Sequence, residues 1–163
     1  MPKLTQVKET KRGRYALFFD GEFAFSLDED TFAMAGLHTG DELEEWQIHD
    51  LQTKSDTRKA VDKAMDLLAL RDHAAGELYQ KLCRSFDPHS AAAAVAKMQE
   101  LNLLDDAGFA RRRAAELLRK RKSRRAILDD LHAKGIDRGA AAEAVEALFA
   151  QSEEDEEENP ELA

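Results

Sequence analysis

Arginine and lysine side chains are concentrated in one short stretch of this 163-residue sequence, between residues 111 and 125. Nine of its fifteen residues are Arg or Lys and only Glu116 is acidic, so the stretch has a net charge of +8. Arginine suits phosphate and carboxylate groups because its planar guanidinium donates two hydrogen bonds at once. The stretch is therefore a candidate for binding phosphates or an acidic partner.

A helical wheel places four of these cations on one outward arc, opposite Phe109, Ala110 and Leu117. The four are Arg111, Arg112, Arg119 and Lys122. Two further arginines extend the arc into the helix expected to follow. We call the resulting set the basic ridge, and its members are Arg111, Arg112, Arg119, Lys120, Lys122, Arg124 and Arg125. A solvated helix face without a partner is the alternative interpretation.

Residue types that form catalytic or metal sites are scattered along the chain. The five histidines show neither an i, i+4 pair nor a His-Glu-x-x-His pattern, and the single cysteine, Cys83, has no Cys-x-x-Cys partner. Asp105 and Asp106 stand where a helix should begin, so capping explains them better than acid–base catalysis. No Gly-rich phosphate loop is present. We predict a protein that is not an enzyme and holds no metal or cofactor.

Charge is unevenly distributed along the chain, although the net charge of -9 would by itself argue against nucleic acid. Residues 1–55 carry 6 basic and 11 acidic groups, residues 56–150 carry 18 and 15, and residues 151–163 carry 0 and 7. The apolar runs are too short to span a bilayer, and the first residues lack the apolar stretch of a signal peptide. With one cysteine, the sequence favours the cytoplasm and no membrane association.

A repeat of about fifty residues organises the helical part of the sequence. Residues 56–104 and 105–150 read as two units of three short helices each. Ser55 or Asp56 is expected to cap the first of these helices, Ser123 to begin the fifth, and Gly135 to end the fifth. Several positions recur at this period, and Arg71 and Arg121 are one equivalent pair. Because both lie on the apolar side of their helices, we predict a structural role for them. Helical repeats bury their apolar stripes against each other and expose side faces suited to long, polymeric partners.

A small α+β module is expected to precede the repeats, over residues 1–52. Residues 4–9 and 14–27 alternate in the manner of strands, and Asp20-Gly21 predicts a hairpin turn. A short helix should follow Asp28 and end at Gly36. We expect a second helix from Asp41 to Leu51, and then a linker at residues 53–56.

The chain after the second repeat changes character abruptly. The third helix of the second unit is expected to end near Phe149. Residues 151–163 contain seven carboxylates, cannot bury apolar surface, and are expected to be a disordered acidic tail. The fold class predicted is mainly α, with two tandem three-helix repeats preceded by a small α+β hairpin module. We also consider the hypothesis that Glu153 to Glu158 mimic the phosphates of a nucleic acid and compete with them for the basic ridge.

Two sequence elements resemble the signature of the bacterial regulatory protein family RecX. They are the run from Asn102 to Ala110, which contains Leu-Asp-Asp-x-x-Phe-Ala, and the run from Leu131 to Ile136, which contains Lys-Gly-Ile. The segments 67–71 and 77–82 resemble the first repeat of that family, and the hairpin module resembles the N-terminal extension of its longer members. The family has three repeats as a rule, whereas two are recognised here.

The resemblance implies a non-catalytic modulator that binds the RecA recombinase and its filament on single-stranded DNA. Such a protein would lie along the filament groove and inhibit strand exchange, ATP hydrolysis and coprotease activity. The basic ridge would then contact RecA or DNA phosphates, and the protein is expected to be a monomer. Two alternatives stay open: a helical module that binds nucleic acid without RecA, and a scaffold whose ridge recognises acidic proteins.

Overall fold

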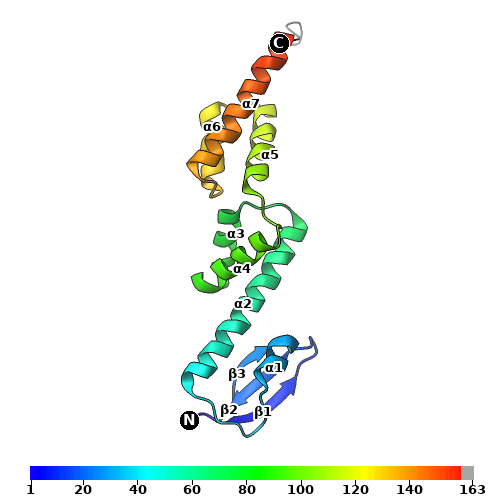
Figure 1. Ribbon diagram of the computed structural model, residues 1–163, viewed down its shortest axis with the longest axis vertical. Helices are drawn as coiled ribbons and strands as arrows, with labels where there is room; N and C mark the ends of the chain where they lie inside the picture. The colour runs from blue at the N-terminus through cyan, green and yellow to red at the C-terminus, as the bar shows by residue number, and fades with distance from the viewer. Residues whose placement is uncertain (159–163) are drawn as a thin grey trace. The chain divides into compact units, whose positions relative to one another are not determined.

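The computed structural model describes residues 1–158, which form a three-stranded sheet followed mainly by helices (Figure 1). The elements are β1 (Leu4–Glu9), β2 (Tyr15–Phe19), β3 (Glu22–Leu27), α1 (Glu29–Ala35), α2 (Glu45–Leu70), α3 (Ala75–Leu82), α4 (Pro88–Glu100), α5 (Asp106–Arg119), α6 (Arg124–Ala133) and α7 (Arg138–Glu158). The predicted fold class, mainly helical after a small α+β module, is confirmed. Over this described range, none of the helices has both the length and the apolar character needed to cross a bilayer.

The chain divides into two compact units. The first contains residues 1–63 and 86–94, and the second contains residues 64–85 with the described residues from 95 onward. Helices α2 and α4 therefore contribute to both units. The assignment of functional repeats to residues 56–104 and 105–150 stays a prediction.

The sheet of the first unit is an antiparallel meander in the order β1-β2-β3. Asp20 and Gly21 form the turn between β2 and β3 with φ values of 50° and 82°, so the predicted Asp-Gly hairpin is confirmed. One face of the sheet is apolar, and its buried side chains pack with Leu43 and Leu51. Tyr15 of β2 stacks on Phe32 of α1 with 4.3 Å between the ring centroids.

Helix α1 has the two ends expected from the sequence. The side chain of Asp28 accepts a hydrogen bond from the backbone N–H of Thr31 at 3.1 Å and caps the first turn. Gly36 ends the helix with φ 61°, which is the left-handed conformation that glycine adopts without steric cost. The predicted helix is thus confirmed at both ends.

Helix α2 begins at Glu45, not at Asp41, so the predicted helix start is wrong. The helix then runs without a break through residues 53–56, so the predicted linker is wrong as well. No Gly or Pro lies between Glu45 and Leu70 to interrupt the helix. Ser55, read from the sequence as a helix start, is buried in mid-helix. Its hydroxyl donates to the carbonyl of Ser26 and accepts from the Arg14 guanidinium at 3.1 Å. Those bonds tie α2 to the sheet and leave the Ser55 hydroxyl satisfied inside the helix.

Helices α5, α6 and α7 pack together around one core in the second unit (Figure 1). Its buried side chains include Phe109, Leu117, Ile127, Leu131, Ile136 and Val145. Asp105, Ser123 and Asp137 each accept a bond from a backbone N–H in the first turn of α5, α6 and α7, respectively. The capping roles expected for Asp105 and Ser123 are therefore confirmed.

Two glycines of the second unit meet backbone to backbone. Gly76 lies in the first turn of α3, and Gly135 lies in the turn between α6 and α7 with φ 84°. A Cβ atom on Gly135 would lie 2.7 Å from Cα of Gly76, and one on Gly76 would lie 2.8 Å from Cα of Gly135. Only glycine fits at either position without a shift of the backbone.

Helix α7 does not end near Phe149, as predicted, but continues to Glu158. The expected disorder of the acidic tail is thus not what the structure describes for residues 151–158. These residues contain neither Gly nor Pro, and glutamate has a high helix propensity, so the helix that begins at Arg138 can continue. Residues 159–163 of the predicted tail lie outside the described part of the chain.

Candidate nucleic-acid interface

Helix α5 positions the first part of the basic ridge. Phe109, Ala110, Ala114 and Leu117 are buried in the core, and the helix therefore turns its other side outward. Arg111, Arg112 and Arg119 lie on that outer side and are exposed. The wheel prediction is confirmed for these three arginines.

The α5–α6 turn holds the middle of the ridge, and the position predicted for Lys122 is wrong. Helix α5 ends at Arg119, so Lys122 lies in the turn and not on the outer arc of the helix. The backbone N–H of Lys122 bonds the carbonyl of Leu117 at 3.0 Å, and that of Arg121 bonds Leu118 at 2.8 Å. These two bonds are the pattern of a Schellman motif, which closes the helix. The wheel failed because it extended α5 past its end.

All seven residues of the basic ridge are exposed, but they differ in how their charges are used. Arg112 pairs with Asp72 at 3.3 Å, and Lys120 pairs with Glu116 at 3.3 Å. The guanidinium of Arg124 lies 4.9 Å from the ring centroid of Phe149. The other four have no ion-pair partner among the described residues: Arg111, Arg119, Lys122 and Arg125. These four are the cations most available to a ligand.

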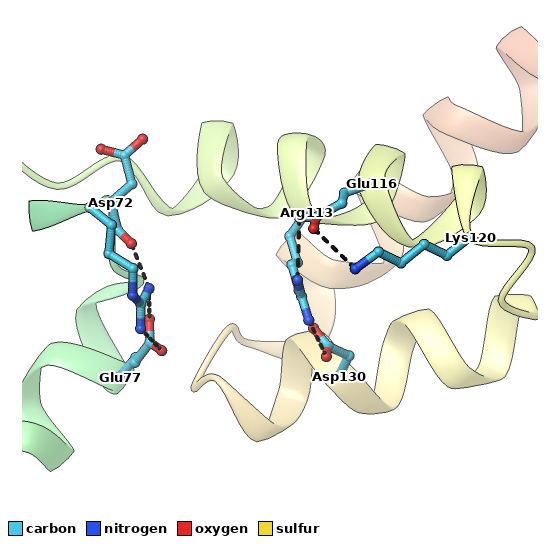
Figure 2. A network of polar contacts seen from close by, with 7 residues as sticks. Asp72, Glu77, Arg113, Glu116, Lys120 and Asp130 are labelled. Atoms are coloured by element: carbon cyan, nitrogen blue, oxygen red, sulfur yellow. Dashed lines mark hydrogen bonds and ion pairs between the residues drawn. The ribbon is translucent and has the colours of Figure 1, made fainter.

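Arg113 belongs to the same charged run, but its side chain has a structural role. Its guanidinium donates two bonds to the carboxylate of Asp130 on α6, at 2.9 and 3.0 Å, and a third to Glu116 at 3.3 Å (Figure 2). The Arg113 and Asp130 side chains are both about one quarter exposed. The hydrogen bonds from Arg113 lower the pKa of Asp130 below its usual value, although partial burial opposes this shift. The pair links α5 to α6.

Asp130 should make stability depend on pH. Because the pKa of Asp130 is lower in the folded protein, its contribution is present above the unfolded pKa of about 4 and is lost as the pH falls through the folded value. We expect Asp130→Asn to cost about 1–3 kcal/mol at neutral pH and progressively less below about pH 4. Urea unfolding across this pH range tests the prediction. Asp129→Asn, at the exposed neighbouring position, should change stability by less than about 0.5 kcal/mol at any of these pH values.

Arg71 and Arg121 differ, although they are equivalent in the sequence repeat. The Arg71 guanidinium donates to both carboxylate oxygens of Glu77, at 3.2 and 2.7 Å, and to the carbonyl of Asp72 at 2.8 Å. The structural role predicted for Arg71 is therefore confirmed. Arg121 is exposed and has no ion-pair partner among the described residues, so the same prediction is wrong for Arg121.

Arg121 has a conformation that disfavours its own side chain. Its φ is 61°, in the left-handed region where Gly stands most often at this position of a Schellman motif. A non-glycine residue there costs about 1–2 kcal/mol. Arg121 is a further exposed cation beside the ridge, and its place between Lys120 and Lys122 was the signal for it in the sequence.

Replacing Arg121 by Gly should therefore increase the stability of the protein and weaken its binding to single-stranded DNA. Relief of the left-handed strain, less the greater flexibility of the unfolded chain, should raise the free energy of unfolding by roughly 0.5–1 kcal/mol. The same change removes one exposed cation and should weaken binding to single-stranded DNA. Chemical unfolding and DNA titration of the same preparation check both effects. A variant that is more stable and binds DNA equally well would show that Arg121 lies outside the interface.

Open grooves border the ridge. One groove of about 400 Å³ is lined by Asp72, Phe109, Arg112, Arg113 and Arg119, among others. A second, of about 320 Å³, is lined by Arg111, Glu143 and several alanines. Within residues 1–158, no three or more His, Cys, Asp or Glu side chains are grouped to hold a metal ion. Exposed cations beside open grooves suit an extended anionic ligand.

These features define a class of protein: a mainly helical one with a small sheet module and an exposed basic face. The comparisons with known proteins identify the family within this class. A solved structure described as "Crystal structure of regulatory protein RecX" has the same fold, with a TM-score of 0.67 and 24% sequence identity over 91% of this chain and 74% of that chain. No family model matches the chain.

The sequence relatives agree with the structural one. A regulatory protein RecX from Caldanaerobacter subterraneus subsp. tengcongensis is 27% identical over 149 residues, which are 91% of this chain and 76% of the relative. The RecX of Lactobacillus gasseri is 31% identical over 158 residues, 96% of this chain and 57% of the relative. The RecX of Lactobacillus delbrueckii subsp. bulgaricus is 36% identical over 140 residues, which are 84% of this chain and 52% of the relative. The chain belongs to the RecX family of regulatory proteins.

Length separates this chain from several of its relatives. It covers 57% of the Lactobacillus gasseri protein and 52% of the Lactobacillus delbrueckii protein, which is less than two thirds in each case. The relatives are named as regulatory proteins, which is consistent with a protein that is not an enzyme.

Proposed function

We propose that this protein binds RecA and its filament on single-stranded DNA and inhibits or modulates the recombinase, ATPase and coprotease activities of RecA. The observation that carries the proposal is the basic ridge. Four exposed cations without an ion-pair partner among the described residues lie on α5, the α5–α6 turn and the first turn of α6, in a chain from a regulatory family. Cations that are not neutralised within the protein are free to replace the counterions of a nucleic-acid backbone.

The chemistry of the ridge favours contacts to phosphate over recognition of bases. Arginine can bond two phosphate oxygens at once, and lysine supplies a point charge. No exposed aromatic side chain lies between the cations in the sequence to stack on a base. Phosphate contacts position a protein on nucleic acid without reading its sequence. Such binding suits a regulator that must act on filaments of any sequence.

The helical repeats give the proposal its geometry. If residues 56–104 and 105–150 act as two repeats, their side faces can meet successive protomers of a repeating filament. We propose that the protein acts as a monomer in the cytoplasm, where RecA filaments form, and without a cofactor or catalysis of its own. The ridge then contacts RecA, the DNA phosphates, or both.

A second candidate is a helical module that binds nucleic acid without RecA. The exposed ridge favours it, because phosphate binding requires no protein partner. The two candidates differ in whether RecA strengthens the binding of the protein to DNA.

Co-sedimentation with RecA filaments separates the two candidates. The protein is mixed with single-stranded DNA, with or without RecA and a slowly hydrolysed nucleotide, at a series of salt concentrations. We expect the protein to pellet with the filament at salt concentrations that release it from DNA alone. Equal release from both would favour the RecA-independent module, and no pelleting with the filament at any salt concentration would contradict the proposed function.

A further inference from the structure

The first unit carries a groove that the basic ridge does not explain. Its volume is about 410 Å³, and its apolar lining comes mainly from Leu37, Leu43, Trp46 and Leu51. Trp46 is 65% exposed, although tryptophan is usually a highly buried side chain. Met34, 90% exposed, lies just before the lining residues Ala35 and Gly36 in sequence. Exposed Trp and Met side chains beside a groove are typical of surfaces that bind another protein.

The backbone around the groove is held in place. The carbonyl of Asp41 accepts from the N–H of Leu4 at 2.8 Å, and the N–H of Leu43 donates to the carbonyl of Pro2 at 3.0 Å. This segment therefore runs beside the first residues of the sheet. The indole N–H of Trp46 donates to the carboxylate of Glu44, which orients the ring. A groove that is already formed loses little entropy when a partner binds.

The charge of the surrounding segment is entirely acidic. Residues 28–53 contain eight Asp or Glu and no Lys or Arg. Asp41 and Glu42 line the groove, and Glu42, Glu44 and Glu45 are exposed. Asp50, also in the lining, pairs with Lys54 at 3.1 Å. The field at this groove repels phosphates and attracts cations, which is the reverse of the basic ridge.

We propose that this groove binds a protein segment in which Lys or Arg residues flank one large apolar side chain. The apolar side chain would fill the groove against Leu43 and Trp46, where its burial supplies most of the binding energy. A flanking cation would lie over the indole face of Trp46 and near Glu42 and Glu45. The proposal goes beyond regulation through the ridge, because it assigns a second surface of opposite charge to a protein partner.

A selection from a random peptide library displayed on phage tests the proposal with the full chain immobilised. We expect enriched peptides to combine Lys or Arg with one large apolar residue. Synthetic copies of these peptides should bind Trp46→Ala roughly thirtyfold more weakly than the parent, as for a central tryptophan anchor. The double variant Glu42→Lys with Glu45→Lys should bind them roughly tenfold more weakly at low salt, and less so at high salt.

Matched controls keep the result specific. Leu70→Ala removes another exposed apolar side chain, and Asp129→Lys with Glu146→Lys makes the same charge change at exposed positions of α6 and α7. Both controls should bind the peptides like the parent. Trp46→Ala should also keep its affinity for single-stranded DNA. A failure of the proposed peptide binding can therefore be distinguished from a failure of the ridge to bind DNA.

Three outcomes would overturn the proposal. The first is that no peptide is enriched, and the second is that enriched peptides are acidic or bind Trp46→Ala as tightly as the parent. The third is self-association of the parent in sedimentation that Trp46→Ala abolishes, with no enriched peptide. That result would assign the groove to a second copy of this chain.

Discussion

Replacing Gly135 by Ala should lower the free energy of unfolding by roughly 2–5 kcal/mol, from left-handed strain of about 1–2 kcal/mol and overpacking of about 1–3 kcal/mol. The strain arises because φ of Gly135 is 84°. The overpacking arises because the new Cβ would lie 2.7 Å from Cα of Gly76, and a backbone atom cannot rotate out of the way. Urea unfolding followed by circular dichroism measures the loss.

Two companion variants show whether the close approach is the cause. Gly76→Ala should also be strongly destabilising, although φ of Gly76 is not positive, because its Cβ would lie 2.8 Å from Cα of Gly135. Gly139→Ala, in the first turn of α7, meets no atom closer than 3.5 Å and should stabilise by up to about 1 kcal/mol. A Gly135→Ala protein as stable as the parent would mean that α3 does not approach this turn as described.

Reversing the four ridge cations that have no ion-pair partner among the described residues should reduce affinity for single-stranded DNA at least about a hundredfold at low salt. The ridge variant carries Arg111→Glu, Arg119→Glu, Lys122→Glu and Arg125→Glu. Each lost phosphate contact removes about 0.7 from the slope of log affinity against log salt, so the slope should become shallower by roughly 3. Fluorescence anisotropy of a labelled oligonucleotide over a series of salt concentrations gives both quantities.

A control variant with the same change in net charge distinguishes the effect of the ridge on DNA affinity from the effect of the net charge of the whole chain. It carries Lys8→Glu, Lys11→Glu, Arg12→Glu and Lys59→Glu, at exposed positions of the first unit that form no ion pair among the described residues. Its salt slope should equal that of the parent. Equal losses in both variants would assign DNA binding to net charge and leave the ridge without a special role.

Local signals in the sequence predicted much of the fold. Asp20-Gly21 predicted the hairpin because two adjacent residues with positive φ are rare outside such turns. Asp28, Asp105 and Ser123 predicted helix starts because their side chains satisfy first-turn N–H groups. Arg111, Arg112 and Arg119 could be placed on the outer face of α5, since the apolar stripe of one helix fixes its other side.

Features that depend on distant contacts could not be predicted. Ser55 looks like a helix start, but its bonds to the sheet allow α2 to continue through it. Lys122 was misplaced because a Schellman motif with Arg121, not glycine, ends α5. Gly135 could be read as a helix end, whereas its approach to Gly76 appears only in three dimensions. The groove at Trp46 was missed although its lining lies within residues 35–51, because the path of that stretch depends on backbone bonds to Pro2 and Leu4.

The most direct test of the central claim is RecA ATP hydrolysis on single-stranded DNA with increasing amounts of this protein. The parent and the control variant should inhibit hydrolysis, and the ridge variant, once shown to be folded, should not. Inhibition by the ridge variant equal to that by the parent would contradict the role of the ridge. A folded parent that leaves RecA hydrolysis unchanged at saturating amounts would contradict the proposed regulation of RecA.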